Sequence, residues 1–231
     1  MDPKNIQFNI SKEVLNLGVS GIYLVISGLK NKERDKEFEV YKTAVLNELL
    51  KVYSVEGFVE SEPILRGFRE LHTKVGRSNR RFISAPEVLI TRFLRIHKLP
   101  HINLLVDIYN LVSLKTRLAF GAHDIKKIDG NVYLKLTTGN ESYVPLGAQD
   151  SRTIFPGEYC YADESDEVLC RMEVLQCDKT KINLTTTDCF YIIQGNKNTS
   201  NEYLLSAVEE LINLTKKYCG GESKILYIPE E

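Results

Sequence analysis

The chain has 231 residues, of which 43% are hydrophobic and 26% are charged, and its formal net charge at pH 7 is −1. A chain of this length can bury a sizeable core, and its composition is ordinary for a soluble globular protein. The near-zero charge excludes a uniformly basic nucleic-acid coat, although it is compatible with a local basic patch.

The sequence shows no sign of a membrane protein. The apolar run at Ile22–Ile26 is far shorter than the roughly 18 residues that a membrane span needs. Residues 1–4 lack the basic and apolar regions of a signal peptide. We therefore expect a cytoplasmic protein without a membrane partner.

Metal and cofactor sites are not expected. The five cysteines include no C-x-x-C pair, so reduced and mostly buried thiols are favoured over a zinc site. The four histidines show no metal-ligand spacing, and the chain has neither a serine nucleophile elbow nor a glycine-rich phosphate loop. ATP and NAD chemistry are therefore disfavoured.

The N-terminal part of the chain predicts short strands followed by helices. Phe8–Ile10, Glu13–Leu17 and Ile22–Ile26 have the composition of strands. Residues 30–36 are charged and are expected to begin a long amphipathic helix. A second helix is expected after Pro63.

Two more helices are expected in the middle of the chain. One should begin at Ser84, because Ser84, Pro86 and Glu87 form a capping-box pattern with proline in the first turn. Another follows Pro100, and we interpret Gly121–Asp124 as a turn.

The C-terminal half predicts strands and a closing helix. The expected strands are Val132–Leu136, Tyr143–Leu146, Glu158–Ala162, Glu167–Val174, Ile182–Thr186 and Phe190–Ile193. The helix is expected over about Asn201–Tyr218. Together these elements predict one α+β domain over residues 1–231, with a mixed β-sheet or β-sandwich core and flanking helices.

Positive charge is concentrated between Arg66 and Lys98, where nine basic residues stand against two acidic ones. Arginine dominates, and its planar guanidinium suits phosphate oxygens. A solvated face paired with the acidic run Glu158–Glu167 would explain the same composition. Our candidates for phosphate contact are Arg77, Arg80, Arg81, Arg92 and Arg95.

The helix after Pro100 has a polar face. Asn103, Asp107 and Asn110 are spaced at i, i+4 and i+7, and could hydrogen-bond an amino group, a ribose hydroxyl or a buried backbone loop. Ordinary surface residues would show the same spacing, although two asparagines are poor helix formers. His123 is a further candidate, and a packed histidine explains it equally well.

Four short motifs follow one another along the chain: Val106–Val112 with Asp107 and Asn110, Asp124–Ile128 before Gly130, Asn140-Glu141 with Leu146-Gly147, and Tyr161-Ala162-Asp163. In this order they resemble the tRNA-editing domain of the phenylalanyl-tRNA synthetase beta subunit, which is built from its third and fourth B subdomains. The resemblance covers about residues 80–193, roughly half of the chain.

The resemblance implies that the protein hydrolyses the ester bond of a mischarged aminoacyl-tRNA, acting in trans on tRNA charged by another enzyme. An editing-domain-like core over about residues 77–195 would carry the packed residues 1–76 and the helix over 201–219. The resemblance implies tRNA as the partner, and it implies no cofactor, DNA or obligate protein partner.

Site roles also come with the resemblance. Glu141 would bind the ammonium or polar groups of the substrate, and Asn110 would support the same pocket, together with Asn103, Asp107, His123 and Asp124. A positioned water, assisted by the terminal ribose hydroxyl, would attack the ester without a covalent nucleophile.

The chain departs from the family at the pocket wall. Leu169–Met172 replaces the family's Ala-Gly-Val-Met segment, and Gly121 stands where the synthetase has a histidine. In the synthetase the amino acid removed is tyrosine. Because the pocket wall is changed, we expect Asp163 and Arg171 to bind something smaller or more polar than tyrosine. Two alternatives stay open: a non-catalytic module that binds tRNA, other RNA or an amino acid in the same pocket, and a small-molecule enzyme without an RNA partner.

Overall fold

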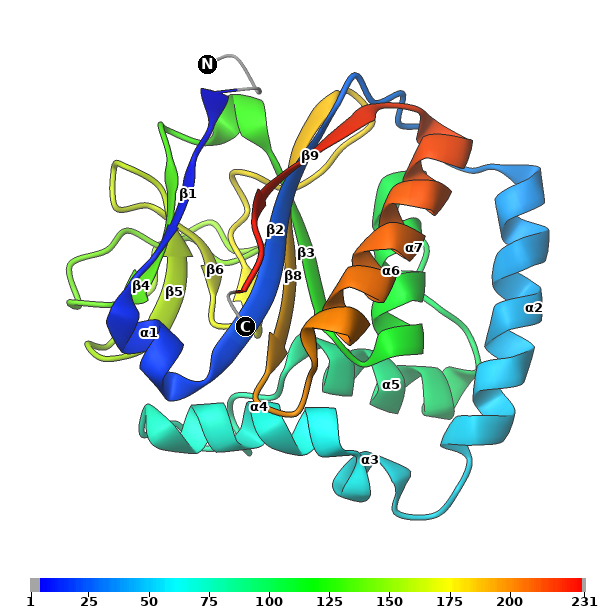
Figure 1. The fold of residues 1–231 in the computed structure, drawn as a ribbon, viewed down its shortest axis with the longest axis horizontal. Helices are drawn as coiled ribbons and strands as arrows, with labels where there is room; N and C mark the ends of the chain where they lie inside the picture. Colours follow the sequence, from blue (N-terminus) through cyan, green and yellow to red (C-terminus); the bar gives the residue numbers. More distant parts are fainter. Residues whose placement is uncertain (1–4, 230–231) are drawn as a thin grey trace.

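The computed structural model of the protein describes residues 5–229, so residues 1–4, which we examined for a signal peptide, lie outside it. The described residues form two β-sheets, with helices packed against one of them. In Figure 1 the sheet that contains β1 lies to the left of the sheet that contains β2 and β8, and α7, α6 and α2 lie to its right. The expected α+β fold with a sandwich core is confirmed.

The two sheets are connected by crossovers of the chain. In the first sheet the strand order is β1 (Phe8–Ile10), β4 (Val132–Leu136), β5 (Tyr159–Ala162), β6 (Val168–Arg171) and β7 (Leu175–Gln176). In the second it is β3 (Ala119–Asp124), β8 (Asp188–Asn196), β2 (Val19–Ser27) and β9 (Glu222–Tyr227). Strand β1 runs parallel to β4, and the other pairs are antiparallel.

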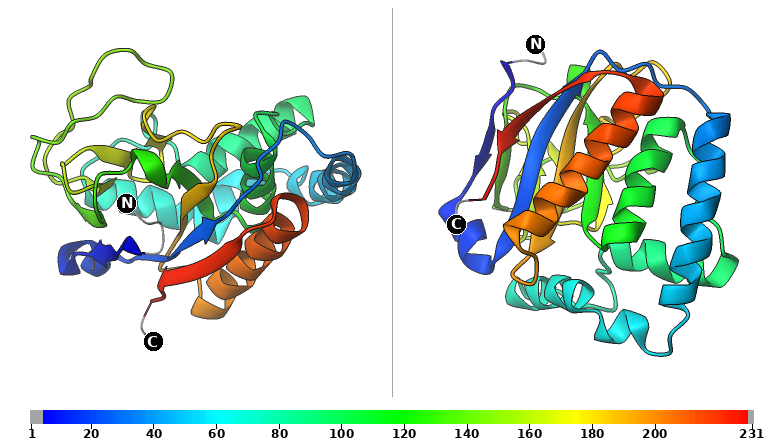
Figure 2. Two further views of the ribbon diagram at one scale, coloured as in Figure 1. Left: turned by 90° about the horizontal axis from the view of Figure 1, so that it is seen from above. Right: turned by 45° about the vertical axis from the view of Figure 1, so that its right-hand side comes forward.

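The helices are short to medium in length. Their bounds are α1 (Lys12–Leu17), α2 (Lys36–Tyr53), α3 (Phe58–Ser61), α4 (Pro63–Lys74), α5 (Ala85–Ile96), α6 (Leu104–Thr116) and α7 (Asn201–Cys219), and a 3-10 turn, η2, covers Ile125–Lys127. None of these described helices is both long and apolar enough to cross a membrane. Figure 2 shows how α7, α6 and α2 line up beside the second sheet.

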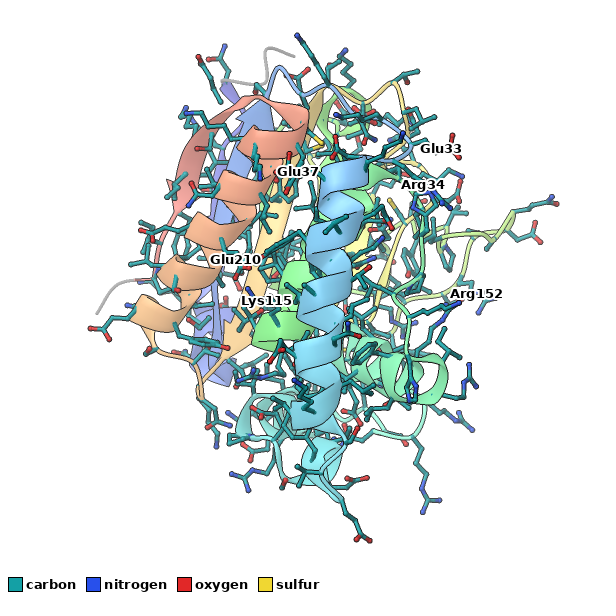
Figure 3. All side chains as sticks on the ribbon, turned by 90° about the vertical axis from the view of Figure 1, so that its right-hand side faces the viewer. Glu33, Arg34, Glu37, Lys115, Arg152 and Glu210 are labelled. Carbon is teal, nitrogen blue, oxygen red and sulfur yellow. The ribbon has the colours of Figure 1, made fainter. Side chains whose placement is uncertain are left out.

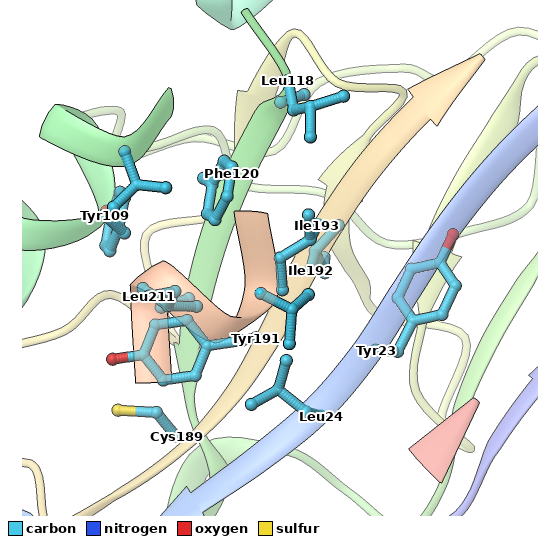
Figure 4. Close-up of a cluster of buried hydrophobic side chains, with 14 of the residues drawn as sticks. Tyr23, Leu24, Tyr109, Leu118, Phe120, Cys189, Tyr191, Ile192, Ile193 and Leu211 are labelled. Carbon is cyan, nitrogen blue, oxygen red and sulfur yellow. The ribbon is translucent and has the colours of Figure 1, made fainter. Parts of the chain in front are cut away.

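Strands β2 and β8 of the second sheet are buried on both faces, which explains their nearly continuous apolar sequences, whereas the edge strand β9 is largely exposed. Tyr23 and Leu24 are consecutive in β2 and fully buried, so they point to opposite faces. On one face Tyr23 stacks on Phe8 of the first sheet with 3.8 Å between ring centroids. On the other face lie Tyr191 of β8 and Leu211 of α7 (Figure 4). The core therefore has two layers.

The helical layer is joined at its surface by an ion pair. Lys115 of α6 and Glu210 of α7 form this pair, and Figure 3 shows both side chains between the two helices. Because the pair is partly exposed, it adds little to the stability that apolar burial provides.

Helix α4 approaches β8 closely at one glycine. A Cβ atom at Gly67 would lie 2.0 Å from Oδ1 of Asn196. The Asn196 Nδ2 atom donates to the Ile64 carbonyl oxygen over 2.9 Å. The amide therefore satisfies the helix backbone at a place where only glycine leaves room for it.

One predicted strand is wrong. Glu13–Leu17 belongs to the helix α1, because the Ser11 hydroxyl accepts a hydrogen bond from the Val14 N–H and begins a helical turn. Gly18 then ends the helix with a φ of 89°. Local capping outweighed the strand-like composition.

Two other predicted strands are loops. Tyr143–Leu146 forms only isolated bridges, and Pro145 within it has no N–H to donate to a ladder. In Ile182–Thr186 the side chains bond to local backbone instead: Asn183 Oδ1 accepts from the Thr185 N–H over 2.8 Å.

Three other segments of the structure differ from the sequence-based prediction. Gly121–Asp124, interpreted as a turn, is the end of strand β3, and strand β9 was not predicted at all. Helix α2 begins only at Lys36, because the Asp35 carboxylate accepts from the next two free N–H groups and so fixes the start.

Candidate functional site

A pocket of about 290 Å³ opens where α6 and β3 meet the hairpin of β6 and β7. Its wall is mainly apolar, with Tyr109 from α6, Phe120 from β3 and Met172 after β6. Its polar side chains are Asn110 on α6, Glu173 between β6 and β7, Gln176 on β7, Lys181 in the following loop and Gln194 on β8. A mostly apolar cavity with a few convergent polar groups is typical of a small-ligand site.

Glu173 is the most heavily bonded polar group of this pocket. Its carboxylate is only 4% exposed and accepts hydrogen bonds from His72 on α4 and from the Tyr159 hydroxyl on β5. The Gln194 amide donates to it as well, over 3.1 Å. The carboxylate therefore has a fixed position, held from three separate elements.

His72 shows the effect of this carboxylate. Burial alone would lower the pKa of the imidazole, but the hydrogen bond and the negative charge of Glu173 outweigh it, and the pKa is raised. The interaction with Glu173 thus favours the protonated form of His72, whose positive charge would compensate the buried carboxylate. Both groups are almost completely buried, so the pair is screened little by solvent.

Asn110 differs from Glu173 in its hydrogen bonding. It is half-buried at the pocket wall, and no side-chain hydrogen bond to it occurs among the described residues. Both its amide donors and its carbonyl oxygen are therefore available to a ligand.

Asn103 and Asp107 lie on the same helix but outside the lining. Asn103 caps α6, accepting from the Val106 N–H over 3.2 Å. Asp107 is buried and accepts from Lys42 over 3.3 Å and from His101 over 2.7 Å. The structure thus brings only Asn110 of the three to the pocket.

One group of possible metal ligands lies around Asp107. Ligand atoms of Glu39, His101 and Asp107 are within 4.8 Å of one another. The Lys42 ammonium lies between the two carboxylates, 2.6 Å from Glu39 and 3.3 Å from Asp107. A lysine cation already occupies the position that a metal ion would take.

His123 and Asp124 are buried beside the pocket. His123 Nδ1 lies 2.7 Å from the Thr180 hydroxyl, and burial lowers the pKa of the imidazole to about 3. Asp124 accepts from the Lys126 N–H over 3.1 Å and from the Thr186 hydroxyl over 2.9 Å. His123 is therefore neutral, and Asp124 holds the following turn.

The other two acidic candidates hold their own loops. Glu141 accepts from the Thr138 N–H over 2.7 Å and from the Gly139 N–H over 2.9 Å. Asp163 accepts from the N–H groups of Ser165 and Glu167. Neither carboxylate is part of the pocket lining.

The comparisons with known proteins concern most of the chain. The model of the B3/4 domain family matches residues 68–220. The chain belongs to the B3/4 domain family. Over 110 residues it is 30% identical to the phenylalanine–tRNA ligase beta subunit of Mycoplasma genitalium, an alignment that covers 46% of this chain and 13% of that protein. The resemblance found in the four motifs is thereby confirmed.

A solved structure shows the same fold over nearly the whole chain. An N-terminal fragment of the phenylalanyl-tRNA synthetase beta subunit from Pyrococcus horikoshii superimposes with a TM-score of 0.52 and 14% identity. The match covers 95% of this chain and 50% of the fragment. This B3/4 domain therefore spans half of the solved fragment and a small part of the curated relative.

Arg77, a candidate for phosphate contact, is paired with the acidic residue Glu158, and Arg171, expected in the pocket, binds the same residue. Arg77 and Arg171 both donate to the carboxylate of Glu158, which is fully buried. Arg171 contacts both oxygens of this carboxylate, over 2.5 and 2.7 Å. It therefore does not enter the pocket.

The other candidate arginines are exposed. Within residues 5–229 none of them forms an ion pair: Arg80, Arg81, Arg92 and Arg95. Unpaired guanidinium groups at a surface remain free to contact phosphate.

Sequence reasoning did not find four polar residues of the pocket lining, Glu173, Gln176, Lys181 and Gln194, of which Glu173 and Gln194 are hydrogen-bonded to each other. Glu173 directly follows Leu169–Met172, the segment in which the chain departs from the synthetase pattern. Gln194 is the first polar side chain after the apolar run Phe190–Ile193. A polar residue at the end of a buried strand was the available signal for Glu173 and Gln194.

Proposed function

We propose that this B3/4 domain binds the aminoacyl end of a tRNA in the pocket beside α6 and hydrolyses the ester of a mischarged amino acid, acting in trans in the cytoplasm. The observation that carries the proposal is the unpartnered amide of Asn110 in the same pocket as the buried carboxylate of Glu173. An aminoacyl ester presents a carbonyl oxygen, which a free hydrogen-bond donor can bind, and an ammonium group, which a fixed anion can bind.

Glu173 would bind the ammonium group of the amino acid. Its carboxylate has about four acceptor positions, of which His72, Tyr159 and Gln194 fill three. The remaining position is available to a substrate cation at the pocket wall. Because the carboxylate cannot rotate away, it would fix the orientation of the ester carbonyl.

Asn110 would donate to the ester carbonyl oxygen. Negative charge develops on this oxygen when water attacks the carbonyl carbon, so a donor aimed there stabilises the transition state. The ribose oxygen then leaves with a proton, which releases the free amino acid and the tRNA.

No lining residue of the pocket is an activated nucleophile, because the Lys181 ammonium is ion-paired with Asp178. The thiol of the pocket belongs to Cys170, and burial raises the pKa of this thiol far above its ordinary value. A thiol that stays protonated at neutral pH is a poor nucleophile. Direct attack by water is therefore the route that these residues support.

The decisive experiment is a panel of tRNAs, each charged with a wrong amino acid, and correctly charged tRNAs as controls. Loss of the ester is measured for the wild-type protein, for Asn110→Ala and for Asn47→Ala, an exposed asparagine on α2. We expect hydrolysis of at least one mischarged tRNA, lost only in Asn110→Ala. A wild-type protein that binds these tRNAs but leaves every ester intact would instead be a non-catalytic binding module.

A further inference from the structure

One aromatic side chain of this protein is unusually exposed. The nine phenylalanines and twelve tyrosines all lie among the described residues, and Phe155 alone is an exposed one, with 55% of its surface accessible. It lies in the loop between β4 and β5, which projects from the first sheet (Figure 2). An isolated exposed phenylalanine is otherwise unfavourable in water, so its surroundings matter.

The Phe155 ring rests on a cation. The guanidinium carbon of Arg77 is 5.1 Å from the ring centroid, and Arg77 Nε donates to the buried carboxylate of Glu158. Arg171 binds the same carboxylate with two hydrogen bonds and lies 4.8 Å from the ring centroid of Phe82. Phe155 is thus one end of a layered arrangement of two rings, two guanidinium groups and one carboxylate.

The backbone at Phe155 is fixed as well. The Thr137 hydroxyl donates to the Phe155 carbonyl oxygen over 2.6 Å and accepts from the Glu158 N–H over 3.0 Å. The Gly157 N–H donates to the Thr137 carbonyl oxygen. The ring is therefore held in place before any ligand arrives, with one face against Arg77 and much of its remaining surface open to solvent.

Positive charge surrounds this ring. Two arginines share the single carboxylate of Glu158, which leaves an excess of one positive charge. Residues 77–82 form a tight turn whose two ends, Arg77 and Phe82, both belong to the layered arrangement. Arg80 and Arg81, which are exposed and form no ion pair among the described residues, belong to this turn and are therefore close to the layered arrangement.

This surface is close to the pocket. Arg171 is the last residue of β6, and its neighbours Cys170 and Met172 line the pocket from the other face. Ala85, three residues after Phe82, also lines the pocket, and its N–H donates to the Glu173 carbonyl oxygen over 2.8 Å. The end of the layered arrangement formed by Arg171 and Phe82 is thus adjacent in sequence to the pocket lining, and Phe155 forms its other end.

We propose that Phe155 is a stacking platform for an unpaired base of the single-stranded 3′ end of the RNA, with Arg80 and Arg81 contacting the adjacent phosphates. A flat ring backed by a guanidinium and flanked by free arginines is the combination that single-stranded nucleic acid requires. The proposal rests on the proposed function, because it takes tRNA as the ligand. It assigns the ring to the nucleotides that precede the aminoacylated one.

The test uses two fluorescently labelled, uncharged RNA hairpins that differ only in a four-nucleotide 3′ overhang, and measures their dissociation constants by anisotropy. We expect the wild-type protein to prefer the hairpin with the overhang. Phe155→Ala should weaken that complex by about fivefold to a hundredfold, the range of base–aromatic stacking, and leave the blunt hairpin unaffected. Val40→Ala, which truncates an even more exposed apolar side chain on α2, should change neither constant.

A second variant gives a direct signal. The chain contains no tryptophan, so Phe155→Trp introduces a single indole that should keep the affinity and lose fluorescence when a base stacks on it. Equal binding of both hairpins, or unchanged overhang binding by Phe155→Ala, overturns the platform. Because the hairpins carry no amino acid, a protein that discriminates between them but hydrolyses no ester supports the platform and overturns the proposed hydrolysis.

Discussion

The Gln194 amide of β8 in the second sheet donates over 3.1 Å to the carboxylate of Glu173, which lies in the turn between β6 and β7 of the first sheet. The amide oxygen of Gln194 accepts from the Tyr161 hydroxyl over 2.6 Å, which fixes the orientation of the amide. Tyr161 in turn contacts the Tyr23 hydroxyl over 3.1 Å. The polar wall of the pocket is therefore one end of a hydrogen-bonded chain between the sheets, and such a chain is costly to interrupt.

Replacing Glu173 tests whether the carboxylate in the polar wall of the pocket acts in deacylation. Glu173→Gln removes the negative charge that would bind the substrate ammonium and that compensates His72, so we expect deacylation to fall by at least about a hundredfold. Tyr161→Phe is the matched control, since it keeps the charge of Glu173 and frees only the Gln194 amide oxygen and the Tyr23 hydroxyl. Its main effect should be a loss of about 1–3 kcal/mol in unfolding free energy, measured by urea denaturation. Equal loss of activity in both variants would contradict a direct role of the carboxylate.

Asn110 and Asp107 lie on one helix and should respond in opposite ways. Asn110→Ala removes no hydrogen bond within the described residues, so we expect a change in unfolding free energy within about 0.5 kcal/mol and a clear loss of activity. Asp107→Ala removes one of the two carboxylates that the buried Lys42 ammonium contacts, together with the acceptor of His101 and the Ile102 N–H, and should destabilise the fold by about 3 kcal/mol. Urea unfolding and ester hydrolysis, measured on both variants, separate the two roles.

These two residues also show what could be predicted from the sequence. Helical spacing correctly predicted α6, but it could not tell that Asp107 points to Lys42, which is 65 positions earlier in the chain. The capping pattern at Ser84 gave the start of α5, although the Ser84 hydroxyl itself makes no cap hydrogen bond. Local signals therefore predicted the elements well.

The candidate site depended on contacts between distant segments. The Glu173 carboxylate is fixed in the pocket only because α4, β5 and β8 bring His72, Tyr159 and Gln194 to it. The residues that neighbour Glu173 in the sequence do not indicate these partners. Glu141 illustrates the reverse problem, because its carboxylate bonds to the N–H groups of its own turn, a use that motif matching cannot distinguish from a ligand contact.

Binding of RNA should depend on salt through Arg80 and Arg81. The double variant Arg80→Ala, Arg81→Ala should weaken tRNA binding and reduce the slope of log K against log salt concentration by about 1.5, since each phosphate contact to single-stranded RNA contributes about 0.7. Arg34→Ala, which removes an exposed arginine near the start of α2 (Figure 3), should leave the slope nearly unchanged. Equal slopes for wild type and double variant would exclude phosphate contact by these arginines.

His123 should make the protein sensitive to acid. Burial lowers its pKa to about 3 in the fold from an ordinary value of 6.5, so between these values the unfolded chain binds a proton that the folded protein does not. The stabilising contribution is complete above pH 6.5 and is lost as the pH falls, by about 3 kcal/mol at pH 4. His72, whose pKa is raised, contributes with the opposite sign and loses its contribution as the pH rises above 6.5.

The two contributions can be separated with His123→Asn, which can keep the hydrogen bond to Thr180 through its side-chain amide. Urea unfolding at a series of pH values should show lower stability than wild type at pH 8, because the smaller side chain leaves a cavity. Between pH 6.5 and 4 the variant should have a flatter profile. A variant that lost stability as steeply as wild type in this range would show that other groups, and not the buried imidazole, cause the acid sensitivity.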